Sequence, residues 1–248
     1  RHLNRSSPSK MFLLLLLPAV AFALSADRRI VGGGDANIAN FMWQGSYRTA
    51  AGSHTCGTVL VADSWALCAA HCGGSSSYST EWGNTNRNTG PYVGVTAVTL
   101  HPNYGQGSGA FPNDISVVQL AGSTNGNAIE MASSRIDSGA AQISGWGRTC
   151  GSCALPITLQ YVDTTVITDA ACTALWGSNY NGNVHVCVYD ADSQASGACN
   201  GDSGGPMVAN GVLHGITSWG ASGCLTTYPS SYTRVSTFRD WACGIIGC

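Results

Sequence analysis

The chain has 248 residues, of which 32 are glycines, 11 are cysteines and only 10% are charged. A chain of this length forms one large all-β unit or two small domains, and its sparse charge excludes coiled coils and disordered acidic or basic tails. Because the formal net charge is −2, the sequence offers no basic surface for nucleic acid. The many cysteines favour an oxidising compartment.

The N-terminal residues have the pattern of a leader. An apolar run over residues 12–24 follows Lys10, is too short to span a bilayer and ends at small residues that suit a signal peptidase. We therefore expect residues 1–10 to be upstream sequence before Met11 and residues 11–25 to be a signal peptide. The product would be secreted and extracellular, without a membrane segment. A buried core helix is the alternative interpretation of the run.

Short β-rich runs follow in chain order, separated by clusters of Gly, Asn, Ser and Pro. We predict strands over residues 92–100, 115–120, 159–167 and 212–219, a closing helix over 235–246, and surface loops over 73–90 and 102–112. Short strands separated by turns indicate a β-sandwich or a barrel. A weak boundary falls near residues 132–138.

Three segments contain side chains suited to nucleophilic catalysis. His71 lies directly before Cys72, Asp114 begins an apolar strand, and Ser203 lies in the turn Gly-Asp-Ser-Gly-Gly-Pro over 201–206. A serine hydroxyl needs a base to accept its proton and donors to hold the oxyanion. Histidine suits the first task near pH 7, and a buried aspartate fixes the imidazole tautomer. A single histidine or aspartate of this kind is usually structural, but the order His, Asp, Ser is far more specific.

With the remaining motifs, these segments resemble the chymotrypsin family of serine endopeptidases, in particular its invertebrate members, over nearly all of residues 30–241. The motifs are Ile-Val-Gly-Gly at 30–33, Trp-Gln at 43–44, Ala-Ala-His-Cys at 69–72, Asn-Asp-Ile at 113–115, Gly-Trp-Gly at 145–147, Ser-Trp-Gly at 218–220 and Tyr-Thr-Arg-Val at 232–235. The resemblance implies an all-β fold for residues 30–248. Two six-stranded antiparallel Greek-key barrels, over about 30–135 and 136–248, would enclose the active site between them, and a helix would close the chain.

The same resemblance implies a role for each site residue. Ser203 would be the nucleophile, His71 the general base and then the general acid, and Asp114 the residue that orients His71. The N–H groups of Gly201 and Ser203 would form the oxyanion hole. The chain would thus be a peptidase that passes through an acyl-enzyme.

The sequence also has the features of a zymogen. Arg29-Ile30 is a trypsin-type cleavage site, so we expect residues 26–29 to be a short activation propeptide that a trypsin-like protease removes. In the family, the new amine of Ile30 pairs with the aspartate before the nucleophile, here Asp202. Ser46 and His54 match a Ser–His pair that holds this aspartate before cleavage. The alternative is that His54 is only a strand residue.

Disulfide connectivity does not follow from cysteine spacing alone. The resemblance implies the pairs Cys56–Cys72, Cys172–Cys187 and Cys199–Cys224, and a further bridge of the family is absent because its positions are Ala141 and Ala209. We expect Cys68 to be a buried free thiol. Cys150 could pair with Cys153 and Cys243 with Cys248, but pairing across these four stays open.

Substrate preference depends on a neutral pocket in this interpretation. Gly197, six residues before the nucleophile, would form the pocket base, and Gly220 and Ser230 its walls. Ser218 and Gly220 resemble the edge that pairs with the substrate backbone as an added strand. We expect cleavage after large apolar residues such as Phe, Tyr, Leu or Met, with Ser230 broadening the preference.

Other ligands and other functions are less well supported. Asp190 and Asp192 are acids near the pocket residues, but their spacing does not match the base; Glu81 is a single acid where a calcium site would need several oxygen ligands. His101, His185 and His214 are expected to be surface or packing residues rather than ligands. We expect no metal or cofactor, no nucleic-acid or membrane partner, and a monomer that binds protein substrates, its activating protease and protein protease inhibitors. The alternatives are a catalytically silent homologue that binds partners and a disulfide-braced structural or carbohydrate-binding β-protein.

Overall fold

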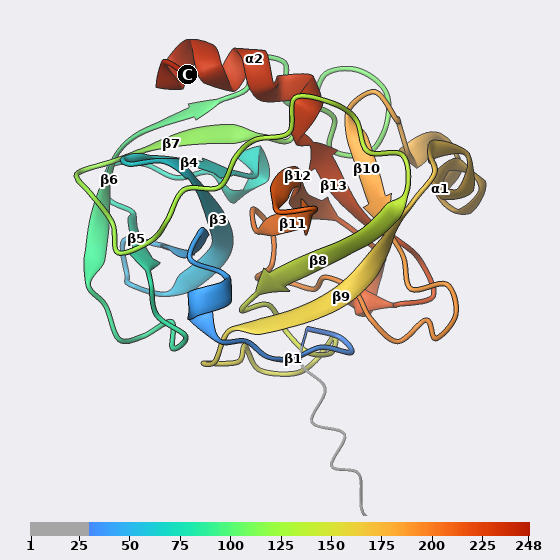
Figure 1. Ribbon diagram of the computed structural model, residues 1–248, viewed down its shortest axis with the longest axis horizontal. Helices are drawn as coiled ribbons and strands as arrows, with labels where there is room; N and C mark the ends of the chain where they lie inside the picture. Colours follow the sequence, from blue (N-terminus) through green and yellow to red (C-terminus); the bar gives the residue numbers. More distant parts are fainter. Residues whose placement is uncertain (1–29) are drawn as a thin grey trace, which may run out of the picture.

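The computed structural model describes residues 30–248, so the expected upstream sequence, signal peptide and propeptide lie outside the described residues. Two closed barrels of antiparallel strands lie side by side (Figure 1). In order around the first barrel, the strands are β2 (Gln44–Arg48), β3 (His54–Ala62), β4 (Trp65–Cys68), β7 (Ser116–Leu120), β6 (Tyr92–Leu100) and β5 (Ser79–Trp82).

The second barrel follows the same plan in the C-terminal half. Its strands in order are β8 (Gly139–Gly145), β9 (Gln160–Ile167), β10 (His185–Val188), β13 (Ser230–Arg234), β12 (Val212–Trp219) and β11 (Pro206–Ala209). A short strand, β1 (Gly34–Asp35), pairs with the first two residues of β9. The expected fold of two six-stranded antiparallel barrels is therefore confirmed.

Helices are few and short. The α-helices are α1 (Asp169–Trp176) and the C-terminal α2 (Val235–Ile246), and the 3₁₀ helices are Ile38–Asn40, Ala70–Cys72, Gly177–Asn179 and Ser222–Cys224. Over residues 30–248, no helix is long and apolar enough to cross a membrane. In α2 the buried residues Val235, Phe238 and Ala242 recur at helical spacing, so one face packs onto the barrels.

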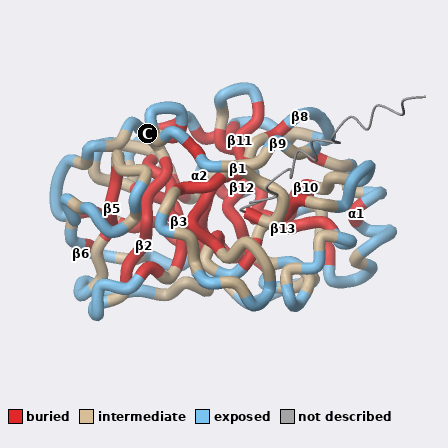
Figure 2. The backbone as a smooth tube through the Cα atoms, turned by 90° about the horizontal axis from the view of Figure 1, so that it is seen from below, coloured by how far each residue is buried: buried red, intermediate tan, exposed pale blue. Residues whose placement is uncertain are grey.

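Alternation along the strands builds two apolar layers. In β3, Leu60 packs inside the first barrel, whereas the adjacent Val59 packs with Leu213 of β12 and Phe238 of α2. Successive strand residues point to opposite faces, so each strand contributes both to a barrel interior and to the layer between the barrels. Figure 2 shows the buried segments running through both halves of the molecule. Burial of one such leucine stabilises the fold by about 2 kcal/mol.

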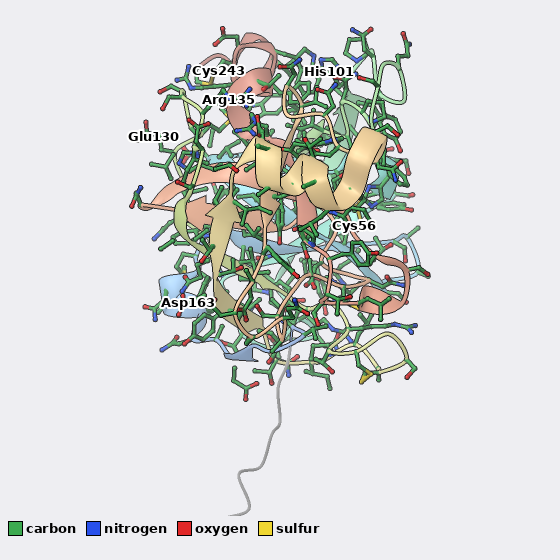
Figure 3. All side chains as sticks on the ribbon, turned by 90° about the vertical axis from the view of Figure 1, so that its right-hand side faces the viewer. Cys56, His101, Glu130, Arg135, Asp163 and Cys243 are labelled. Atoms are coloured by element: carbon green, nitrogen blue, oxygen red, sulfur yellow. A yellow bond between two sulfur atoms is a disulfide. The ribbon has the colours of Figure 1, made fainter. Side chains whose placement is uncertain are left out.

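Five disulfides brace the described chain, three of which are the pairs that the resemblance implies. The bonds join Cys56 to Cys72, Cys172 to Cys187, Cys199 to Cys224, Cys150 to Cys153 and Cys243 to Cys248. Cys68 is a buried free thiol. In Figure 3, Cys243 and His101 lie at the end of the molecule that contains α2, and the His101 ring packs against Phe238.

Most of the expected elements are present, with two differences. The strands at 92–100 and 212–219 and the helix at 235–246 have the expected bounds, and those at 115–120 and 159–167 begin one residue later. The surface loop expected over 73–90 is wrong in part, because it contains β5, where Thr80, Glu81 and Trp82 are buried. Three of the four residues of β5 are polar, so the sequence of this segment does not have the apolar pattern of a buried strand. The eight-residue helix α1 was not expected.

The expected division near residue 135 is crossed at both ends of the described chain. The strands of the first barrel lie between residues 44 and 120, and those of the second between 139 and 234. However, β1 pairs with β9 of the second barrel, and α2 packs with residues of both barrels. These crossings hold the barrels together and so stabilise the layer where the candidate site lies.

Candidate active site

His71 and Asp114 meet through two hydrogen bonds. The short 3₁₀ helix Ala70–Cys72 carries His71, and the disulfide Cys56–Cys72 ties this helix to β3. The ring Nδ1 of His71 lies 2.6 Å from Oδ2 of Asp114, and its backbone N–H donates to Oδ1 at 2.8 Å. A carboxylate beside Nδ1 keeps the proton on that nitrogen, so Nε2 is left as the proton acceptor.

Asp114 is fully buried and is held by both barrels. The Ser218 hydroxyl, from β12, donates to Oδ2 at 2.5 Å, and Thr233, from β13, donates to the Asp114 carbonyl at 2.7 Å. Before it, Asn113 has a φ of +56°, a left-handed conformation that asparagine tolerates. The Asn113 amide donates to two carbonyls of the preceding loop. Hydrogen bonds to its carboxylate and to its backbone therefore fix the orientation of Asp114.

Ser203 lies in a turn whose neighbouring N–H groups are available. Within the described chain, neither the N–H of Gly201 nor that of Ser203 donates a hydrogen bond, whereas the N–H of Asp202 between them donates to Cys199 at 2.9 Å. The Ser203 carbonyl accepts from Gly57 of β3 at 2.7 Å, which anchors the turn on the first barrel. No hydrogen bond joins Ser203 to His71 in this conformation; catalytic hydrogen bonds often tighten only when substrate binds.

A cavity of about 170 Å³ opens beside Ser203. It is lined by Ala198, Cys199, Asn200, Ser203, Thr217, Ser218, Trp219, Gly220, Ala221, Ser222 and Cys224, none of which is charged. Ser203 and Ser218 thus line the same cavity, and Ser218 reaches Asp114 and through it His71. The structure therefore brings the three distant segments together at one place between the barrels.

The expected pocket residues occupy different positions around this cavity. Gly220 is exposed, and a Cβ there would meet nothing within 4 Å. Gly197 and Ser230 are buried and are not among the lining residues. The Ser230 hydroxyl accepts from the N–H of Ala198 at 3.0 Å, and a Cβ on Gly197 would lie 3.1 Å from that hydroxyl. Asp190 contacts Ser193 and Ser196 of its own loop, and Asp192 is exposed.

Comparison with known proteins agrees with this geometry. A family model described as Trypsin matches residues 30–242. The chain belongs to the trypsin family of serine proteases. A chymotrypsin-like serine proteinase of Haliotis rufescens is 39% identical and covers 92% of this chain and 96% of its own length. A fibrinolytic enzyme, isozyme C, of Lumbricus rubellus is 38% identical over 86% of this chain and 98% of its own, and a trypsin delta of Drosophila erecta is 36% identical over 92% and 96%.

The family assignment confirms the main conclusion from the sequence. This chain is a serine endopeptidase, a hydrolase of peptide bonds, and its substrates are proteins. Secretion and synthesis as a zymogen are typical of the family. The five disulfides suit an extracellular protein.

Asp202 of the peptidase is buried against two glycines. Its carboxylate accepts from the N–H groups of Gly147 at 2.8 Å and Cys199 at 2.9 Å. Burial raises the pKa of Asp202 to about 7, although these two hydrogen bonds oppose the shift. A Cβ at Gly145 or Gly147 would lie 2.2 to 2.3 Å from atoms of this carboxyl group, so the Gly-Trp-Gly sequence is needed for the contact.

Ile30 and His54, which the sequence links to Asp202, contact other residues in this structure. Ile30 is 1% exposed and packs inside the second barrel, and the next residue, Val31, bridges to Gly197. The His54 ring contacts the Ser46 hydroxyl at 2.8 Å and, through Nε2, the Gly201 carbonyl at 3.0 Å. Burial lowers the pKa of His54 to about 4, so the neutral ring donates to Gly201. In this conformation His54 therefore holds the Gly201 turn and not Asp202. Arg29 lies outside the described residues.

Metal-ligating groups near the site are engaged in other bonds. Over residues 30–248, the one cluster of such side chains is His71 with Cys56 and Cys72, whose sulfurs are joined to each other. Glu81 is 2% exposed and pairs with Arg48 at 3.5 Å. The guanidinium of Arg48 thus neutralises that carboxylate.

Two contacts of the site were not expected from the sequence. The Ser-Trp-Gly motif identified Ser218 only as an edge for substrate, whereas its hydroxyl also donates to Asp114. Thr233 belongs to the motif Tyr-Thr-Arg-Val, which predicts no role for it, although it fastens the Asp114 backbone. Both contacts join segments more than 100 residues apart, so no local pattern could have indicated them.

Proposed function

We propose that Ser203 is the nucleophile of the peptidase. Nε2 of His71 takes the hydroxyl proton as Oγ attacks the scissile carbonyl carbon, and the carbonyl oxygen becomes an oxyanion. The imidazolium then gives its proton to the leaving amine, the C–N bond breaks and an acyl-enzyme remains. Water repeats the sequence, with His71 again as base, and releases the acid and the serine hydroxyl.

Two sets of hydrogen-bonding groups support this proposal most directly: those that fix His71, and the N–H groups beside Ser203 that make no hydrogen bond. Asp114 accepts from both the ring and the backbone of His71, which orients Nε2 and stabilises the imidazolium. The N–H groups of Gly201 and Ser203 make no hydrogen bond to described residues. They are therefore free to bind the developing oxyanion, whose stabilisation usually contributes more than any other single effect to such catalysis.

Labelling of the serine tests this assignment. After cleavage at Arg29, a phosphonofluoridate should modify Ser203 stoichiometrically and abolish hydrolysis of peptide anilides, and mass spectrometry should locate the adduct. Ser203→Ala should remove labelling while leaving the Tm unchanged, and Ser222→Ala, at another serine of the same cavity, should retain both labelling and activity. A folded, cleaved protein that takes up no label would favour the alternative of a catalytically silent binding protein.

We further propose a preference for large apolar residues before the scissile bond. The cavity beside Ser203 has no charged lining residue, and Gly197 supplies no acid to pair with lysine or arginine. Gly220 leaves the entrance open, and the buried Ser230 hydroxyl would shorten the base. The relatives carry both chymotrypsin-like and trypsin names, so the lining and not the names supports this preference. Dominant cleavage after arginine would contradict it.

Activation is proposed to follow cleavage between Arg29 and Ile30. The new amine would reach Asp202, because Ile30 already packs in the second barrel and Asp202 has only backbone N–H donors among the described residues. Pairing with a cation would stabilise the buried carboxylate and the adjoining Gly201 turn. Before cleavage, His54 would hold Asp202 and would then move to the Gly201 carbonyl. If His54→Ala left the background activity of the uncleaved chain unchanged, this exchange of partners would be wrong.

The cellular context completes the proposal. The signal peptide expected at 11–25 would send the chain out of the cell, where a trypsin-like protease would cut after Arg29. The mature enzyme would act as a monomer on proteins or peptides, and protein protease inhibitors would be its natural antagonists. It needs no cofactor in this mechanism.

A further inference from the structure

His185 is a buried histidine to which the proposed mechanism gives no role. It begins β10 and is fully buried. Its Nδ1 accepts from the N–H of Asn181 at 3.2 Å, while Nε2 has no hydrogen bond of normal geometry in the described chain, although the backbone of Ala110 and Phe111 lies near the ring. A buried polar side chain with an unpaired nitrogen costs stability compared with an apolar residue. A histidine at this position therefore calls for a physical reason, which its two neighbours supply.

One side of the His185 ring faces the loop that leads to Asp114. A Cβ on Gly109 would lie 3.0 Å from Cε1 of His185, so the loop backbone rests directly on the ring. The loop is fastened there by the N–H of Ala110, which donates to the Asn179 carbonyl at 2.7 Å. The next residue is Phe111, whose ring packs against His71 at a centroid distance of 5.7 Å.

The same ring also contacts Trp219, which lines the cavity beside Ser203. The two rings meet edge to face with centroids 5.5 Å apart, and Trp176 packs on Trp219 in the same manner at 4.9 Å. The Trp219 ring thus packs against both His185 and Trp176, and we call these two ring contacts the clamp. Because Trp219 lies between Ser218 and Gly220, a substrate chain that pairs with this edge must pass the Trp219 ring.

The ring of His185 is neutral at neutral pH. Burial lowers its pKa to about 4, with a smaller effect in the same direction from Arg234, while backbone contacts with Phe111 and Ala110 and the charge of Asp114 oppose the shift. The other titratable neighbour is Tyr180, whose ring lies 5.8 Å away. A neutral imidazole packs against indole without introducing a buried charge, so the contact with Trp219 is present at neutral pH.

We propose that His185 is a positioning residue for substrate binding, because its ring fixes Trp219 and the loop at 108–111 relative to each other beside Ser203. This inference rests on the proposed function and adds a specificity determinant to it. His185 touches no reacting atom. It acts on the substrate residues that precede the scissile bond, through the orientation of Trp219.

Kinetics with two substrates of different length test the proposal. The substrates are a tetrapeptide p-nitroanilide ending in Phe, which must cross Trp219, and acetyl-Phe p-nitroanilide, which is too short to do so. His185→Asn keeps an acceptor for Asn181 but removes the ring. It should raise the KM of the tetrapeptide about three- to tenfold, the range that an aromatic contact supports. The kcat and the KM of the short substrate should stay within about twofold.

Two further variants separate ring packing from general damage. His185→Phe loses the bond from Asn181 but keeps an aromatic edge, so it should restore a KM near that of the wild type. His214→Asn changes a half-buried histidine of β12 that does not contact Trp219, and it should alter neither KM. If His185→Asn does not fold, His185→Gln fills more of the space and takes its place. An unchanged tetrapeptide KM, or equal changes for both substrates, would overturn the proposal.

A measurement without substrate keeps this inference separate from the proposed function. Acrylamide quenching of tryptophan fluorescence at pH 7 should increase in His185→Asn, because Trp219 loses one side of its clamp, and should not increase in His185→Phe or His214→Asn. A wild type that cleaves neither anilide would contradict the proposed function alone. Quenching would then decide the role of His185, and identical quenching in all four proteins would show that the ring does not position Trp219.

Discussion

At the residue scale, Oδ2 of Asp114 is a shared acceptor. It accepts from the His71 ring and from the Ser218 hydroxyl, at 2.6 and 2.5 Å. Both bonds fix the direction of the carboxylate, and therefore the direction in which the His71 ring presents Nε2. A serine that also lines the substrate cavity is thus part of the support of the base.

Ser218→Ala should lower kcat about ten- to hundredfold, because a hydrogen bond to a charged group is lost from the support of His71. The measurement is kcat on a Phe anilide across the pH–rate profile, whose acidic limb should also shift. Ser222→Ala removes a hydroxyl of the same cavity that does not touch Asp114 and serves as the control. Equal effects of the two substitutions would contradict a specific role for Ser218.

Gly197→Asp should change the residue that the enzyme accepts before the scissile bond. The Cβ would lie 3.1 Å from the Ser230 hydroxyl, and Gly197 has no positive φ that would exclude a side chain. A carboxylate there should raise kcat/KM for an Arg anilide and lower it for a Phe anilide, each by about tenfold or more. Gly244→Asp, on α2, should change neither. If Gly197→Asp left the cleavage of the Phe anilide unchanged, this position would not be the pocket base.

At the scale of elements, β2 and β5 are joined by a buried ion pair. Arg48 of β2 is 6% exposed and reaches Glu81 of β5 as well as carbonyls of Gly52 and Arg87. The second Glu81 oxygen accepts from the N–H groups of Thr89 and Gly90. The pair therefore anchors the loop after β5 to the barrel wall, and it explains how a polar segment can form a buried strand.

Arg48→Met should reduce the free energy of unfolding by about 3–5 kcal/mol, because it leaves the Glu81 carboxylate buried without its cation. Urea denaturation measures this change. The double variant Arg48→Met/Glu81→Gln should recover most of the loss, since it removes the unpaired charge. Arg239→Met, at a pair between a half-buried arginine and the exposed Asp240, should reduce stability far less. A single variant as stable as the wild type would show that the pair does not anchor the loop.

The predictions of secondary structure were correct where the local sequence pattern was sufficient. Short β-rich runs bounded by turn residues predicted β6 and β12 with the observed bounds, and the closing helix predicted over 235–246 is α2. Strand β5 was not predicted, because Thr80 and Glu81 are polar and their hydrogen-bond partners come from β2, β6 and the following loop. A buried polar strand is visible only when its hydrogen-bond partners are known.

At the scale of the whole molecule, acid should destabilise the fold through its buried histidines. Burial lowers the pKa of both His54 and His185 to about 4, below the usual value of about 6.5. The unfolded chain therefore binds more protons between pH 6.5 and pH 4. The stability that each neutral ring retains above pH 6.5 is lost as the pH falls through this range.

The difference between wild type and His185→Phe isolates one of these contributions, since Asp202 and the other titrating groups are common to both. Across pH 6.5 to 4, the free energy of unfolding of the wild type should fall relative to the variant by up to about 3 kcal/mol. Urea titrations at half-unit pH intervals give both curves. Parallel curves would mean that His185 becomes charged as readily in the folded protein as in the unfolded chain.

The sequence by itself indicated an all-β fold of short strands and contained the order His71, Asp114, Ser203, because composition and motifs are local information. Its resemblance to a known family implied the two barrels and three of the disulfides. Only the tertiary structure decided that Ser218 and Thr233 hold Asp114, that Arg48 neutralises Glu81, and that His185 and Trp176 clamp Trp219. Each of these contacts depends on closure of a barrel or on the packing of one barrel against the other. Such closure brings together residues that are 30 to more than 100 positions apart, so no local stretch of the chain specifies them.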